Sequence, residues 1–221
     1  MHPTVIFFEL GYIFNILGIV ILVLHIRAKK HIEGISFYTQ LIFCVAAYVK
    51  LFYMPFTVLK EYAFCWIEFI ASLVLSAVLM YQLKKYKRLS FTKESNFFDW
   101  RLILLASAVL AFISTYEKSH AFEWSQYAIR FSIISEAIGL LPQLRLMKLE
   151  KFVPRYFGWY LLSILANRVS RLGFWYYQVK DNFSRDSYYT LILADVVYIV
   201  LTADFAYNFL KHRNNTLIPY A

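Results

Sequence analysis

The sequence has little of what a soluble, a repetitive or a disulfide-bonded protein contains. Only 17% of its 221 residues are charged and 60% are hydrophobic, a balance that excludes an ordinary soluble domain. Six glycines and five prolines exclude a collagen-like or low-complexity chain. The two cysteines, Cys44 and Cys65, both fall within apolar segments, so we do not expect the disulfide framework of a small secreted protein.

Motifs of catalysis are also missing. The sequence has no zinc-ligand spacing, P-loop, dinucleotide-binding glycine motif or nucleophile elbow. Its five histidines lie near the ends of apolar segments and form no ligand pair. We therefore expect no enzyme activity, no cofactor and no metal site.

Apolar segments separated by short polar ones make up most of the chain. They predict an all-α membrane protein with seven transmembrane helices in a single domain, residues 1–221, ending in a short tail from about residue 211. Most of the segments are long enough to cross a hydrocarbon core of about 30 Å. The fourth is short, so it must extend through Trp100, tilt little or be shielded by neighbours. The expected helices are Val5–Ile26, Phe37–Leu59, Ala63–Leu83, Leu102–Tyr116, Tyr127–Leu146, Phe157–Val179 and Tyr188–Leu210.

Basic residues between the segments predict the orientation of the chain. The regions after the first, third, fifth and seventh segments carry a net positive charge, whereas the opposite regions are nearly neutral. Because cytoplasmic loops carry the excess of lysine and arginine, we expect a lumenal or extracellular N-terminus and a cytosolic C-terminus. These basic residues adjoin membrane ends, where anionic lipids attract them, so they do not imply a nucleic-acid partner.

The fifth apolar segment carries a stripe of polar and small residues. Ser132, Glu136, Gly139 and Gln143 recur at spacings of four, three and four, which places them on one helical face. Pro142 is expected to close this stretch. A carboxylate within a membrane helix needs a partner or a water-filled cavity, so we expect six other helices to surround this one.

Charges inside the apolar segments balance one another. Four are basic and four are acidic, which is the result that mutual pairing inside a bundle would give, because an unpaired charge in lipid is costly. The eight residues are Lys50, Glu68, Arg130, Glu136, Arg168, Arg171, Asp195 and Asp204. Charges that only hold helices together would give the same balance, and the sequence leaves that alternative open.

Three of these cations are candidates for binding a ligand that carries a carboxylate, namely Lys50, Arg168 and Arg171. Trp175 shares a helix face with the two arginines and would pack against the ligand or against an arginine stem. An ordinary core or interfacial tryptophan is the alternative.

The two aspartates of the last segment are nine residues apart. Asp195 and Asp204 therefore lie on opposite sides of a helix, so only one of them can face a given site. The other is expected to serve a different helix contact.

Three stretches of the sequence carry a family resemblance. They are Glu33-Gly34-Ile35-Ser36-Phe37 followed by Thr39-Gln40, Ser135-Glu136-Ala137 leading to Leu141-Pro142-Gln143-Leu144, and Asp204-Phe205 before Tyr207. Along nearly its whole length the chain resembles the ER lumen protein-retaining receptors, the KDEL receptor family. This resemblance implies a fold similar to SWEET transporters, with two three-helix repeats joined by a linking helix.

The resemblance also implies a function. Such a receptor binds the C-terminal retention tetrapeptide, of the KDEL or HDEL type, of ER-resident proteins that have escaped to the Golgi. Binding is favoured at acidic pH, and COPI-coated vesicles return the complex from the Golgi membrane to the ER membrane. The implied partners are thus C-terminal peptides of lumenal ER proteins, the COPI coat and membrane lipid.

Site residues follow from the same resemblance. The implied ligand-binding residues are Lys50, Gln126, Glu136, Arg168, Arg171, Trp175 and Gln178. A role in retrieval or conformational change is implied for Asn15 and Asp204, and a role in coat recruitment for Lys211 and Arg213.

The chain departs from the family pattern at several of these positions. Lys50 replaces an arginine, which keeps the charge and loses the bidentate fork. Arg171 replaces a tyrosine, and Gln178 replaces an arginine. Asn15 stands where a pH-linked histidine is usual and cannot titrate. We therefore expect an altered ligand signal, or binding that is weaker and less sensitive to pH.

Two other functions fit the same helices. A SWEET-like or PQ-loop transporter would move a small solute across the scaffold, and a structural helix bundle would keep only a degenerate site. The density of cations within the apolar segments favours an anionic ligand over a neutral sugar.

Overall fold

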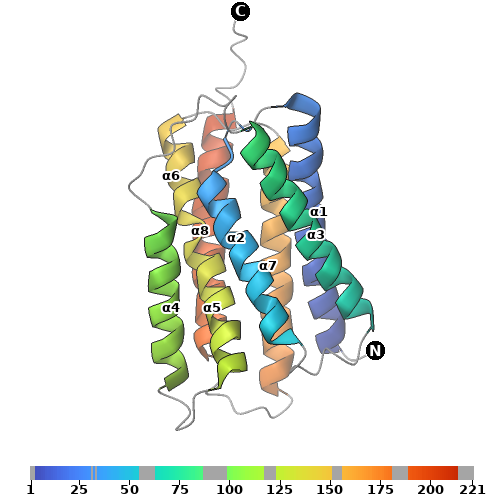
Figure 1. Cartoon of the computed structure of the whole chain (residues 1–221), viewed down its shortest axis with the longest axis vertical. Coiled ribbons are helices and arrows are strands. Elements are labelled where there is room, and N and C mark those ends of the chain that lie inside the picture. The colour runs from blue at the N-terminus through green and yellow to red at the C-terminus, as the bar shows by residue number, and fades with distance from the viewer. Residues whose placement is uncertain are drawn as a thin grey trace, which may run out of the picture.

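The computed structural model describes residues 3–30, 32, 34–54, 63–86, 99–116, 123–150, 156–180 and 189–213. Within these ranges the chain forms α-helices and one short 3-10 helix, and no strand (Figure 1). The elements are α1 (Pro3–Lys29), α2 (Phe37–Val49), η1 (Lys50–Phe52), α3 (Ala63–Tyr86), α4 (Trp100–Tyr116), α5 (Trp124–Ile138), α6 (Leu141–Glu150), α7 (Tyr156–Lys180) and α8 (Tyr189–Arg213). The all-α prediction is confirmed for this part of the chain.

Five of the seven predicted segments match one helix each to within a few residues, and α4 begins at Trp100, one of the alternatives for the short fourth segment. The second segment differs. It was expected to run to Leu59, but α2 ends at Val49 and a single 3-10 turn, η1, follows. Residues 55–59 of that prediction lie outside the described part.

The fifth segment is divided into two helices, α5 and α6, by Gly139 and Leu140. Pro142 was expected to close this stretch, and that prediction is wrong because Pro142 lies in the first turn of α6. Proline has no N–H, and its ring clashes with the carbonyl four residues earlier, here that of Ile138. The first turn of a helix tolerates proline because its N–H groups have no partner within the helix. The helix therefore ends at Ile138 and a new one starts.

Helices α1 and α7 pack side by side in opposite directions. Three glycines mark their contact: Gly173 faces Phe7, Gly11 faces Asn167, and Gly18 faces Tyr160 and Ser163. Small residues allow two helix backbones to approach closely. The end of α7 therefore lies beside the beginning of α1 (Figure 1).

The remaining contacts divide the helices into two sides of one bundle. Helix α5 packs against α2, α4 and α8, whereas α1 packs against α3 and α7 (Figure 1). Helices α7 and α8 contact each other and link the two sides. The expectation that six helices surround α5 is therefore wrong for the described part of the chain, because α5 packs mainly against three of them.

Helix α4 has apolar side chains on its outer face and buries its polar ones, which is the arrangement that lipid requires. On α4, Leu102, Val109 and Phe112 are exposed, whereas Ser107 and Thr115 are buried and donate hydrogen bonds to carbonyls one turn earlier. A hydroxyl bonded within its own helix needs no water, and an apolar outer face suits lipid. The short α4 is thus compatible with a membrane.

By length and composition, α1 and the Trp66–Tyr86 part of α3 are apolar enough to cross a membrane. Together with the exposed apolar side chains, these two helices support a membrane protein. Seven crossings, the orientation and the arrangement in two three-helix repeats stay predictions.

Replacing Gly139 with alanine is expected to destabilise the bundle. A Cβ there would lie 2.8 Å from Ile42 Cγ2 on α2 and 2.7 Å from the Ser135 carbonyl oxygen on α5, so both α2 and the backbone at residue 139 must shift. Overpacking of this kind costs about 1–3 kcal/mol. Thermal unfolding in detergent measures the loss. Gly18→Ala is the matched control, because its Cβ would make ordinary 3.4 Å contacts, and its unfolding temperature should be unchanged or slightly raised.

Candidate functional site

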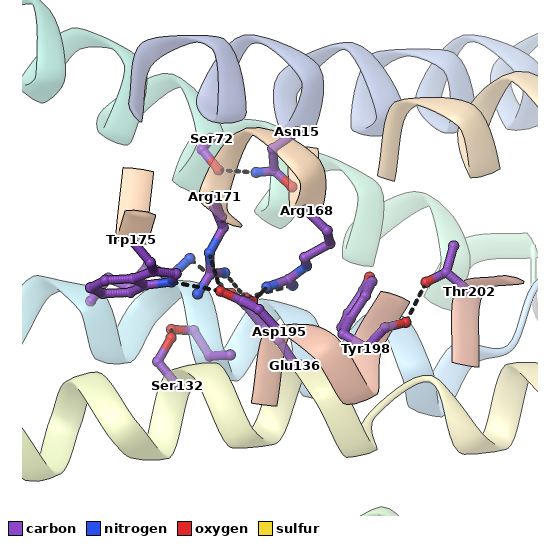
Figure 2. A network of polar contacts seen from close by, with 12 residues as sticks. Asn15, Ser72, Ser132, Glu136, Arg168, Arg171, Trp175, Asp195, Tyr198 and Thr202 are labelled. Atoms are coloured by element: carbon purple, nitrogen blue, oxygen red, sulfur yellow. Dashed lines mark hydrogen bonds and ion pairs between the residues drawn. The ribbon is translucent and has the colours of Figure 1, made fainter. Parts of the chain in front are cut away.

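Five charged side chains from four elements meet inside the bundle, and we name this group the charge cluster. It consists of Lys50 in η1, Glu136 in α5, Arg168 and Arg171 in α7, and Asp195 in α8. Figure 2 shows the two arginines converging on the two carboxylates. The cations that were expected to bind a carboxylate do share one place, and each of them is already ion-paired.

Glu136 accepts contacts from all three cations of the charge cluster. Lys50 Nζ lies 2.8 Å from Oε1, while Arg168 Nη2 and Arg171 Nη1 lie 2.7 and 2.9 Å from Oε2. Glu136 is buried, and charge-assisted hydrogen bonds of this length are the strong ones. It therefore ties η1 and α7 to α5.

Asp195 is the second carboxylate, and its side chain is 0% exposed. Arg168 Nη1 lies 2.9 Å from Oδ1, and Arg171 Nε lies 3.3 Å from Oδ2. Trp175 Nε1 also donates a hydrogen bond of 2.8 Å to Oδ2 (Figure 2). Trp175 thus helps to fix a carboxylate, which the sequence did not indicate.

Arg168 is the centre of the charge cluster because its planar guanidinium group contacts both carboxylates. One terminal nitrogen binds Glu136 and the other binds Asp195. The guanidinium also lies over the ring of Tyr198, with its carbon 3.7 Å from the ring centroid. Lysine could not make these contacts at once, because it is a single point charge.

Helical spacing explains why these residues meet. Arg168, Arg171 and Trp175 recur at spacings of three and four, and Asp195 and Tyr198 at a spacing of three, so each set lies on one face. Because α7 packs against α8, the two faces oppose each other. The charge cluster holds three cations and two carboxylates, a net charge of +1.

The polar stripe predicted on the fifth segment is confirmed as one face, and it faces α2 and the loop before it. Ser132 donates to the carbonyl of Ala46 at 3.0 Å. Beyond the break, Gln143 donates to the carbonyl of Gly34 and accepts from the N–H of Ser36, both at 2.7 Å. The stripe therefore holds α2 near both of its ends, at Ala46 and at its N-cap Ser36.

Of the eight intramembrane charges, the five of the charge cluster are confirmed to pair with one another. Within the described part of the chain, neither carboxylate oxygen of buried Glu68 has a hydrogen-bond partner. The same holds for Nε and Nη1 of buried Arg130. Asp204, in α8, is half-buried. A simple net charge of zero therefore did not predict which charges pair.

Several predicted site residues lie away from the charge cluster. Asn15 donates to Ser72 Oγ at 3.1 Å and links α1 to α3 (Figure 2). Gln126 is half-buried in the first turn of α5, ten residues before Glu136. Three predicted residues have side chains outside the described part, although their backbones are helical: Gln178, Lys211 and Arg213.

Two members of the site were not among the predicted site residues, namely Asp195 and Tyr198. Asp195 was recognised as an intramembrane charge, and its separation from Asp204 showed that only one of the two could face the site. Tyr198, three residues later, shares its face. Deciding between the two aspartates required the packing of α7 against α8.

The chemistry of the site is that of binding. Fixed guanidinium and ammonium groups in a buried place bind carboxylates. Among the described residues, no three histidine, cysteine, aspartate or glutamate side chains are grouped so that they could hold a metal ion. The arrangement therefore suits recognition of an anionic group.

Comparisons with known proteins identify the family of this chain. The family described as ER lumen protein retaining receptor matches residues 31–178. ER lumen protein-retaining receptor erd-2.2 of Caenorhabditis elegans is 29% identical over 203 residues, 87% of each chain. Receptor A of Arabidopsis thaliana is 28% identical over 218 residues, 93% of this chain and 94% of its own. The Saccharomyces cerevisiae receptor is 26% identical over 211 residues, which cover 87% of this chain and 92% of its own. The chain therefore belongs to the family of ER lumen protein-retaining receptors.

Proposed function

We propose that this protein binds the C-terminal retention tetrapeptide, of the KDEL or HDEL type, of ER-resident proteins that have reached the Golgi. It returns them to the ER in COPI-coated vesicles. The observation that carries the proposal is the meeting of Lys50, Arg168 and Arg171 in one buried cluster of net charge +1. A peptide terminus brings the carboxylate that such a cluster can bind.

Access to the charge cluster differs among its three cations. The side chains of Lys50 and Arg171 are 16% and 18% exposed, whereas that of Arg168 is only 5% exposed. A ligand carboxylate would therefore meet Lys50 and Arg171 first. Arg168 would hold the two internal carboxylates in place behind them.

The proposed orientation gives the ligand a route from the lumen. Arg168 is the middle residue of α7, and Arg171 and Trp175 lie in its second half, which ends beside the start of α1 (Figure 1). If the N-terminus is lumenal, as the basic loops predict, the charge cluster lies in the lumenal half of the bundle. The protein then resides in ER and Golgi membranes with a cytosolic C-terminus.

The other proposed roles follow the family. By that resemblance we assign ligand contacts to Gln126, Gln178 and Trp175 as well. Asn15 and Asp204 are assigned a part in the change that starts retrieval. After ligand binding, the end of α8 recruits the coat. The residues for this step are Lys211 and Arg213, one lysine and one arginine in the last turn of α8.

Titration of the purified protein with a labelled HDEL-type peptide tests the proposal. The free acid should bind, and the same peptide with an amidated C-terminus should bind at least about tenfold more weakly, because it lacks the anion. Between about pH 5.5 and about pH 7.4 the affinity should change little, since Asn15 cannot titrate. Equal binding of acid and amide, or solute flux in proteoliposomes without peptide binding, would contradict the proposal.

A further inference from the structure

We infer that the charge cluster accepts one ligand carboxylate and no more, and that Asp195 sets this limit. The inference rests on the proposed function and specifies which peptide ends the site prefers. Asp195 is thereby a specificity-determining residue of the site.

Asp195 already occupies the donors that a second ligand carboxylate would need. Its two oxygens receive Arg168 Nη1 at 2.9 Å, Arg171 Nε at 3.3 Å and Trp175 Nε1 at 2.8 Å. Its side chain is fully buried, so it is a fixed part of the site. Asp195 on α8 therefore supplies the site with a carboxylate of the protein's own.

The charge balance then decides how many anions can enter. With Lys50, Arg168 and Arg171 opposed by Glu136 and Asp195, one carboxylate brings the net charge from +1 to zero. A second one would leave a net charge of −1 in a buried place, where uncompensated charge is costly. It would also approach two carboxylates that already share Arg168.

The consequence concerns retention signals that contain acidic side chains. The terminal carboxylate is the anion that enters, because it lies at the end of the chain and can reach furthest into the bundle. Acidic side chains upstream of it stay outside the charge cluster. Binding should therefore depend strongly on the free terminus and weakly on the acidic residues before it.

The unmodified protein and three variants form a charge series. The unmodified cluster has a net charge of +1, Asp195→Asn has +2, Arg171→Gln has zero, and Arg171→Gln with Asp195→Asn again has +1. Asparagine keeps the size of Asp195 and can still accept from Trp175. Glu136→Gln is less suitable, because it also removes the ion pair of Lys50.

The experiment compares peptides ending in Asp-Glu-Leu and Asn-Gln-Leu, each with a free and an amidated terminus. For the unmodified protein, the amide should weaken binding by at least about tenfold, and the Asn-Gln exchange should change it by less than about threefold. Asp195→Asn should prefer the acidic peptide by about tenfold. The double variant should return to the preference of the unmodified protein, and Arg171→Gln should lose discrimination between acid and amide.

Different results would contradict the proposed function and the one-carboxylate limit. If no peptide binds the unmodified protein, the proposed function fails and this inference falls with it. If the free acid binds but the Asn-Gln exchange weakens it by more than about tenfold, the proposed function stands and the one-carboxylate limit is wrong. This second comparison uses the unmodified protein alone, so it decides the question even if Asp195→Asn does not fold.

Discussion

Replacing Arg168 with alanine is expected to abolish peptide binding and to cause the largest loss of stability of any single change in this protein. The substitution removes the guanidinium that bridges Glu136 and Asp195 at 2.7 and 2.9 Å. It leaves two buried carboxylates with fewer cations, and breaking a buried ion pair in this way costs about 3–5 kcal/mol. Thermal unfolding in detergent and peptide titration measure the two effects.

Two further variants separate charge from geometry at this position. Arg168→Lys keeps the charge but loses the fork, so it should recover part of the stability and little of the binding. Arg101→Ala is the surface control, because Arg101 is exposed at the start of α4 and its removal should leave both measurements unchanged. Full binding by Arg168→Ala would show that the ligand site lies elsewhere.

Sequence reasoning located the cations because charges are rare in apolar segments. Lys50, Arg168 and Arg171 could be chosen without any structure, since each interrupts a segment that is otherwise apolar. Their common position could also be expected for the two arginines, which share a helix face. The polar stripe of α5 was predictable for the same reason, because helical spacing is a local property.

The partners of these cations could not be predicted in the same way. Asp195 and Asp204 are equivalent by spacing, and only the packing of α8 against α7 places Asp195 beside the arginines. Glu68 and Arg130 balance each other in a count of charges, yet they lie on α3 and α5. A count of charges contains no information about which helices are neighbours.

The ends of two helices, α5 and α2, could also not be predicted correctly from the sequence. Pro142 marks the break between α5 and α6 in the sequence. The sequence predicts it as the end of the first helix, whereas it lies in the first turn of the second. The end of α2 at Val49 has no proline within the four positions after it. The change to η1 places Lys50 beside Glu136, so a tertiary ion pair accompanies a helix end that local sequence does not mark.

Replacing Glu136 with glutamine is expected to have the second-largest effect, and the loss should depend on Lys50. Glutamine keeps the shape of Glu136 but removes its charge, so Lys50 loses the 2.8 Å ion pair to Oε1. Arg168 and Arg171 keep their ion pairs with Asp195 in this variant. Lys50 is left as a buried ammonium without a carboxylate, which is strongly unfavourable. The free energy of unfolding should fall by about 3 kcal/mol.

Adding Lys50→Met to Glu136→Gln tests that explanation, because replacing both members of a buried pair is often nearly neutral whereas removing one is costly. The double variant should recover at least about half of the lost stability, giving a coupling of about 1–3 kcal/mol between the two positions. Lys50→Met alone should cost less than Glu136→Gln, since Glu136 keeps Arg168 and Arg171. If the double variant is instead less stable than Glu136→Gln, then Lys50 is stabilised by other contacts, such as that with the ring of Tyr12 at 5.9 Å, and the charge cluster does not depend on this pair.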